Sequence, residues 1–163
     1  MIIETILTIA GVAAVAGIVN LFGVGSKSVS KISFKETFDL LNAPIISFMY
    51  EGKKLHFLLD TGSSLSHIKP SVVESLGIER QESGGGTLSA NGIIESDGRC
   101  SIPLGYKDER YVADFMITKG LAESLDILKR DFNLDVHGVL GCDFFDKYNY
   151  VVDFKEAVAY SKE

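Results

Sequence analysis

Short hydrophobic runs separated by glycine, proline and polar residues dominate the chain from residue 45 onward. Such runs are typical of β-strands, and the turn residues between them favour hairpins. Strands are therefore predicted at residues 45–50, 55–59, 93–104 and 111–117, followed by a closing hairpin of residues 151–154 and 157–160. Many short strands with few helices predict one mainly β domain over residues 45–163, built as a small closed barrel.

Two stretches of this domain have a helical pattern instead. Pro70 stands where a first helical residue is expected and Gly77 where a helix ends, which predicts a short helix at residues 70–76. Over residues 121–132, leucines and a phenylalanine recur at spacings of three and four, which predicts an amphipathic helix. No internal repeat is visible, so the chain holds a single copy of this domain.

The first part of the chain has a different composition. Residues 5–26 carry no charged side chain and consist mostly of Ile, Leu, Val, Ala and Gly. About 20 helical residues cross a bilayer core of about 30 Å. We therefore expect a single-pass transmembrane helix at residues 1–25 and a linker or leading arm at residues 26–44. A signal peptide is an alternative, because Ala14-Val15-Ala16 resembles a cleavage site, although a basic region before it is missing. A buried core helix is another alternative.

The charges beside the apolar segment predict the orientation of the chain across the membrane. Lys27, Lys31 and Lys35 follow the apolar segment and no Lys or Arg precedes it. By the positive-inside rule, the β domain is expected in the cytoplasm.

The overall balance of charge and cysteine excludes other classes of protein. The net charge of -6 leaves no electrostatic footprint for nucleic acid, so no nucleic-acid partner is expected. Cys100 and Cys142 are the two cysteines, too few for a disulfide framework. Both are expected to be small buried hydrophobic residues.

The stretch Leu58-Leu59-Asp60-Thr61-Gly62-Ser63-Ser64 carries the most chemical information. An ionisable aspartate follows two apolar strand residues, so it is expected at the end of a buried strand. Gly62 allows a sharp turn, and the Thr61 hydroxyl can tie that turn down. An ordinary turn at the end of a strand is the alternative for this tripeptide taken alone.

A second feature lies near the carboxyl end of the chain. Gly138-Val139-Leu140-Gly141 is followed by Cys142-Asp143-Phe144-Phe145 and later by Val151-Val152-Asp153-Phe154. Glycine beside an apolar pair lets a strand pass close behind the Asp60 turn. In their order and context, these elements over about residues 45 to 160 resemble the retropepsin-like aspartic proteases.

The resemblance implies a fold, an assembly and a set of site residues. In that family two copies of a closed β domain meet at their Asp-Thr-Gly turns, and an extended polypeptide is the substrate. By resemblance, Asp60 is the catalytic carboxylate, Thr61 bonds across the dimer axis, and Gly62 and Ser63 complete the turn. The strand behind the site comprises Val139, Leu140 and Gly141, and the flap includes Gly84, Gly85, Gly86, Asn91 and Gly92.

The chemistry of this family explains why two chains are expected. Hydrolysis of a peptide bond without a metal needs a base to activate water and an acid to protonate the substrate. Two carboxylates that share one proton do both, and they titrate as a pair. The chain has one Asp-Thr-Gly, so a homodimer supplies the second carboxylate. Asp143 and Asp153 are interpreted as structural or surface residues, and neither metal nor cofactor is expected.

Some of the same residues are also compatible with other chemical functions. Ser63, Ser64 and His67 suggest a serine hydrolase, but side chains so close along one turn converge poorly on a substrate. His56, His67 and His137 lack metal-ligand spacing. Gly84-Gly85-Gly86 lacks the Lys-Ser/Thr of a phosphate-binding loop. A non-catalytic retropepsin-like module that dimerises or binds peptides stays open as the alternative function.

Overall fold

The computed structural model describes residues 30–82, 86–89 and 92–162. Its helices are α2 (Lys35–Leu41), α3 (Pro70–Leu76), α4 (Lys119–Phe132) and α5 (Cys142–Lys147). Its strands are β1 (Ile32–Ser33), β2 (Ile45–Tyr50), β3 (Lys53–Leu59), β4 (His67–Ile68), β5 (Gly86–Ser89), β6 (Gly92–Glu95), β7 (Arg99–Tyr106), β8 (Glu109–Ile117), β9 (Gly138–Leu140), β10 (Tyr150–Asp153) and β11 (Val158–Ser161).

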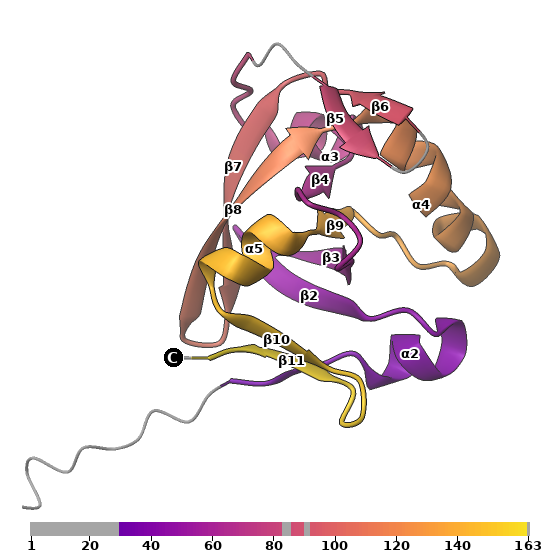
Figure 1. The fold of residues 1–163 in the computed structure, drawn as a ribbon, viewed down its shortest axis with the longest axis vertical. Coiled ribbons are helices and arrows are strands. Elements are labelled where there is room, and N and C mark those ends of the chain that lie inside the picture. Colours follow the sequence, from indigo (N-terminus) through magenta and orange to yellow (C-terminus); the bar gives the residue numbers. More distant parts are fainter. Residues whose placement is uncertain (1–29, 83–85, 90–91, 163) are drawn as a thin grey trace, which may run out of the picture.

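Six strands close into a barrel in the order β2-β3-β9-β4-β8-β7 (Figure 1). The hairpins β2–β3 and β7–β8 are antiparallel, whereas β9 runs parallel to β3 and antiparallel to β4. The prediction of a mainly β, closed-barrel fold with short helices is confirmed.

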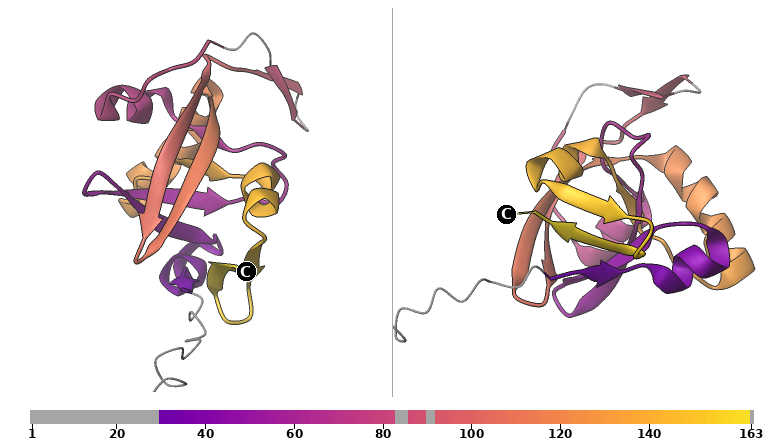
Figure 2. Two further views of the ribbon diagram at one scale, coloured as in Figure 1. Left: turned by 90° about the vertical axis from the view of Figure 1, so that its left-hand side faces the viewer. Right: turned by 60° about the horizontal axis from the view of Figure 1, so that its bottom comes forward.

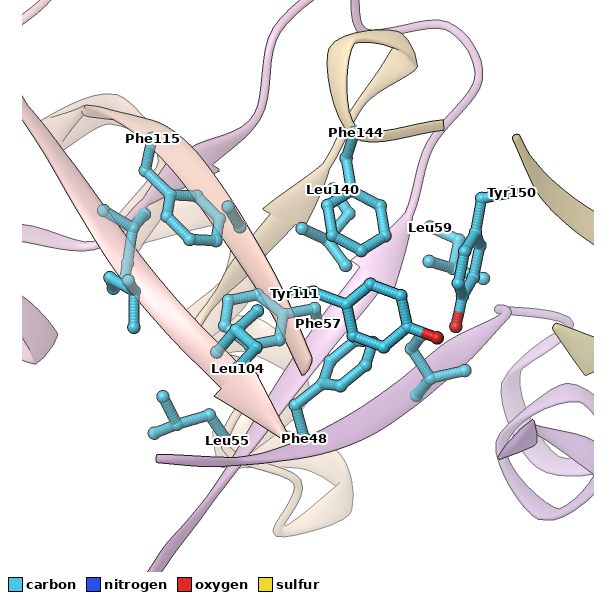
Figure 3. Close-up of a cluster of buried hydrophobic side chains, with 14 of the residues drawn as sticks. Phe48, Leu55, Phe57, Leu59, Leu104, Tyr111, Phe115, Leu140, Phe144 and Tyr150 are labelled. Atoms are coloured by element: carbon cyan, nitrogen blue, oxygen red, sulfur yellow. The ribbon is translucent and has the colours of Figure 1, made fainter. Parts of the chain in front are cut away.

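Alternation along the strands fills the barrel. In β3 the residues Leu55, Phe57 and Leu59 are buried while the residues between them are at least partly exposed. Their side chains meet the aromatic ring of Phe48 from β2 and that of Phe115 from β8 in one core (Figure 3). Burial of such large apolar side chains contributes about 1.5–3 kcal/mol each to folding.

A three-stranded sheet of order β1-β11-β10 lies beside the barrel (Figure 2). Ile32 pairs with Ala159, and both side chains are buried. Phe34 is also buried and its ring meets Phe38 of α2 and Phe154 edge-on, while the rings of Phe38 and Phe154 lie tilted against each other. The segment 26–44, expected to be a linker or arm, therefore contains a strand and a helix that belong to the folded unit. Strand β1 is too short to show a periodic pattern in the sequence.

The strand expected at residues 93–104 is two strands, β6 and β7. Gly98 lies between them with a φ of 125°, and a Cβ there would come within 2.8 Å of the Gln81 carbonyl oxygen. This left-handed conformation breaks the strand. Strands β5 and β6 pair as the hairpin in the region of the expected flap (Figure 2). Its predicted members Gly84, Gly85 and Asn91 lie outside the described residues.

Both helices that the sequence predicts are present in the structure. Helix α3 begins at Pro70 and ends before Gly77, whose φ is 63°, as predicted from these two residues. Helix α4 contains the predicted residues 121–132 and buries Leu125. Across residues 30–82, 86–89 and 92–162, every helix is too short or too polar to cross a membrane. The predicted transmembrane segment, residues 1–25, lies outside the described residues and stays a prediction.

Candidate active site

Asp60 lies where β3 leaves the barrel. Its N–H donates to the Leu140 carbonyl at 3.0 Å, which extends the β3–β9 pairing by one residue. Its Oδ1 accepts a hydrogen bond from the Gly62 N–H at 2.8 Å, and the Ser63 N–H reaches the Asp60 carbonyl at 3.2 Å. Asp60 is half-buried while Thr61 and Gly62 are exposed. The turn therefore presents a carboxylate at the surface in a fixed orientation.

The strand next to this turn in the sheet is β9. Leu58 pairs with Val139 and Leu59 with Leu140, so the predicted residues Val139, Leu140 and Gly141 run alongside the end of β3 and Asp60. A Cβ at Gly141 would be 2.5 Å from the Leu65 carbonyl oxygen and 2.8 Å from that of Ser63. Since real side chains do not tolerate such contacts with backbone, only glycine lets the 63–65 backbone pass this closely.

Asp143 joins the turn to helix α5 from the other side. Its Oδ2 accepts from the Ser66 N–H at 3.0 Å and its Oδ1 from the Ser66 hydroxyl at 2.7 Å. The Gly141 N–H donates to the Ser66 Oγ at 3.0 Å, and the Asp143 N–H donates to the Ser64 carbonyl at 3.2 Å. The turn that carries Asp60 is thus held at both ends, by β9 and by the start of α5.

Comparisons with known proteins agree with this arrangement. The family model for aspartyl proteases matches residues 46–101, which include the Asp60 turn. Among solved structures, a retropepsin-like aspartic protease from Rickettsia conorii aligns with 82% of this chain and 89% of its own, at 15% identity and a TM-score of 0.52. The retroviral protease-like domain of Ddi1 from Leishmania major aligns with 73% of this chain and 87% of its own, at 13% identity and a TM-score of 0.52. A search of curated proteins finds no significant match.

This chain has the retropepsin-like fold. The resemblance seen in the sequence is therefore confirmed, and the barrel places the Asp-Thr-Gly turn between β3 and β4.

The retropepsin-like turn also involves a cysteine that sequence reasoning misplaced. Cys142 is exposed, and its thiol donates to the Thr61 carbonyl at 3.2 Å while its N–H donates to the Ser63 carbonyl at 2.8 Å. The expectation of a buried hydrophobic residue is wrong for Cys142, because the start of α5 reaches the surface there. It is right for Cys100, where burial raises the thiol pKa to about 11.

His67 lies on β4, the strand that follows the turn. The ring is buried, and its Nδ1 lies 3.0 Å from the Thr118 hydroxyl. Burial lowers its pKa below the ordinary value of 6.5, although the carboxylates of Asp143 and Asp60 act in the opposite direction. The Ser63 hydroxyl donates to the Leu65 carbonyl at 2.6 Å rather than to an imidazole. Within the described residues, neither Ser63 nor Ser64 has a hydrogen bond to His67, so the serine-hydrolase alternative lacks a nucleophile–base pair.

The other two histidines lie together at a distance from the turn. The His56 N–H donates to His137 Nδ1 at 3.0 Å, and His56 Nδ1 lies 2.8 Å from the Ser47 hydroxyl. Within the described part of the chain, no three His, Cys, Asp or Glu side chains gather as metal ligands.

Sequence reasoning missed the parts of the site that depend on distant residues. Ser66 and Asp143 are 77 positions apart, so their hydrogen bonds leave no local pattern. Asp143 was interpreted as structural or surface, and its contacts are structural. The signal that pointed toward it was the Gly138–Gly141 run immediately before it, which predicted a strand behind Asp60.

Proposed function

We propose that this protein is an aspartic endopeptidase that works as a homodimer, with Asp60 from each copy acting on one water molecule. The observation that carries the proposal is the half-buried Asp60 carboxylate at the surface, which accepts a hydrogen bond from Gly62 in a turn held at both ends in a retropepsin-like fold. Peptide hydrolysis by this route requires a base and an acid together.

The chain has one Asp-Thr-Gly, so one copy supplies one carboxylate of this kind. Asp143 is the acidic residue tied to the same turn, and both of its oxygens accept hydrogen bonds from Ser66. A carboxylate engaged in this way is unsuited to activate water. The second Asp60 of a dimer is therefore the natural partner, and the two like charges then share one proton.

The remaining site residues have roles within this proposal. Thr61, exposed beside Asp60, bonds across the dimer axis. The β5–β6 hairpin serves as the flap over an extended polypeptide substrate. The composition of residues 1–25 supports a transmembrane anchor with the protease domain in the cytoplasm. Tethering two copies to one membrane raises their effective concentration and favours the dimer.

The membrane part of the proposal has its own test. The full-length protein is expected to stay in the membrane pellet after a carbonate wash, with its amino terminus intact. Recovery of a soluble form that begins near Gly17 would show instead that the segment is a signal peptide.

The catalytic part is tested by mixing active and inactive copies. The full chain should cleave an unstructured protein at mildly acidic pH, and pepstatin should inhibit it. Asp60→Asn should abolish cleavage while leaving the thermal unfolding midpoint close to wild type. Titrating Asp60→Asn chains into wild type should suppress activity, since mixed dimers hold one unaltered carboxylate.

Exposed Asp146 on α5 provides the matched control, and Asp146→Asn chains should neither lose activity nor suppress it. Mixed dimers that form and retain full activity would contradict the shared site. A wild-type chain that dimerises and binds peptides but never cleaves them would favour the non-catalytic module.

A further inference from the structure

A row of side chains crosses four barrel strands beside Asp60. Leu58 of β3 pairs with Val139 of β9, Val139 with His67 of β4, and His67 with Met116 of β8. Directly paired residues point to the same face of a sheet, so these four side chains share one face.

Asp60 continues this face. It lies two residues beyond Leu58, and its N–H extends the ladder to Leu140. The residues that alternate with them along the strands, among them Leu59, Leu140 and Ile68, point into the barrel core. The row therefore lies on the outer face that also carries the candidate catalytic carboxylate.

His67 is the one titratable member of this otherwise apolar row. The residue is 7% exposed, and its Nδ1 is engaged by the Thr118 hydroxyl. That hydroxyl donates in turn to the Met116 carbonyl at 3.4 Å, which leaves it to accept the Nδ1 hydrogen. Nε2 has no hydrogen-bond partner among the described residues.

This second ring nitrogen is not sealed inside the protein. Within the described residues, the Tyr150 hydroxyl is the only fully buried side-chain nitrogen or oxygen atom without a partner. Nε2 of His67 is not one of these sealed, unpartnered atoms, and its ring is held in place by Thr118. An immobilised ring with one open nitrogen is prepared to bond a group that arrives from outside.

Resting on the proposed function, we infer that His67 is a specificity-determining residue that selects a hydrogen-bonding substrate side chain, an amide above all, over an aliphatic one of the same shape. An amide both donates and accepts, so it satisfies Nε2 whether the ring is neutral or protonated. An aliphatic side chain leaves this desolvated nitrogen without a partner, which costs binding free energy.

The charges around the ring fit this role. The carboxylates of Asp143 and Asp60 raise the His67 pKa, but burial lowers it by more, so the pKa falls below its ordinary value and the neutral ring is favoured. A substrate carboxylate at the same place would meet the negative charge of Asp60 and Asp143. A neutral amide avoids this repulsion and keeps the hydrogen bond.

The test compares asparagine with leucine, which have nearly the same shape, at each position of a peptide library. With the full-length wild type, kcat/KM should be about five- to tenfold higher for asparagine at one position, as expected for one hydrogen bond. His67→Leu should reverse this ratio. His67→Gln, which places an amide near the same point, should restore the preference.

His56→Leu is the matched control, because it makes the same change on β3 at a ring already engaged by Ser47. It should leave the ratio unchanged. If His67→Leu does not fold, Thr118→Val takes its place, since it removes the hydroxyl that holds the ring and should at least halve the preference.

Cleavage with the same preference in wild type and His67→Leu would overturn this inference and leave the proposed function standing. Folded, dimeric wild type that cleaves no peptide at all would overturn both.

Discussion

Asp143 matters at the scale of single residues because it holds the Asp60 turn without belonging to it. Its carboxylate accepts hydrogen bonds from the Ser66 N–H and hydroxyl and from the Phe144 N–H at 2.8 Å. Ser66 is 1% exposed, so water cannot replace a lost partner. The placement of Asp60 therefore depends on a side chain at the start of a different element.

Asp143→Ala should lower kcat by about tenfold to a hundredfold, because small displacements of reacting groups are costly. It should also lower the free energy of unfolding by about 1–3 kcal/mol, because it leaves the buried Ser66 groups unpaired. Steady-state kinetics and denaturant unfolding measure the two effects. Asp143→Asn keeps one acceptor oxygen and should fall between alanine and wild type. An alanine variant with wild-type kcat would show that Asp143 does not position the turn.

What the sequence predicts at this scale depends on how local each feature is. The Asp60 turn was predicted because the aspartate, the glycine and the preceding apolar strand are adjacent. The Ser66–Asp143 bonds and the Cys142–Thr61 contact were not, since each joins residues more than 70 positions apart. The exposure of Cys142 depends on its contact with Thr61 and on its place at the start of the short helix α5. The small number of cysteines in the chain could not predict it.

At the scale of elements, the segment before the barrel is part of the fold. Strand β1 occupies the edge of the β1-β11-β10 sheet, and Ile32 and Phe34 are 4% and 2% exposed. The long strands and helix α4 were predicted because several periods of their pattern are visible. Strands β1 and β4 have two residues each, and two residues show no period, so only tertiary pairing reveals them.

Removing β1 should therefore destabilise the barrel domain. A chain that begins at residue 35 loses the burial of Ile32 and Phe34, which should lower its free energy of unfolding by about 3–5 kcal/mol relative to a chain that begins at residue 30. Denaturant unfolding of the two chains measures the difference. Substituting exposed Lys31 with alanine in the longer chain serves as the control and should change little. Equal stability of the two chains would mean that β1 does not contribute to the fold.

At the scale of the whole molecule, one buried and two half-buried histidines couple folding to acidity. Burial is the largest influence on His56, His67 and His137, and the pKa of each is lowered from 6.5. The unfolded chain then takes up protons before the folded one as pH falls. Stability from this source is complete above pH 6.5 and declines below it.

A carboxylate adds a second acidic step. Burial alone would raise the pKa of Asp135, but hydrogen bonds from Lys69 and Lys129 outweigh it and hold the pKa at about 2. Its contribution is present above the unfolded value of about 3.9 and is lost as pH falls toward 2. The Asp135 side chain is 42% exposed, so screening reduces the effect to about 1 kcal/mol.

Urea unfolding should therefore show two declines, one below about pH 6.5 and one below about pH 4. Asp135→Asn should flatten the lower decline and leave the upper one, and His56→Gln should reduce the upper one. Exposed Asp146→Asn should alter neither. Stability that is constant from pH 7 to pH 5 would contradict the assignment of the upper decline to the histidines.

The pairing of β1 with β11 also limits how far the barrel can lie from the membrane. Ile32 is fixed to Ala159, so with residues 1–25 in a bilayer as proposed, residues 26–31 alone join the membrane to the barrel. Fully extended, these residues reach about 20 Å. A catalytic centre on so short a tether reaches peptide segments close to the lipid surface and does not reach those farther out in the aqueous phase. Inserting a flexible spacer after residue 29 should extend cleavage to sites farther from the membrane, and an unchanged set of cleaved sites would refute this limit.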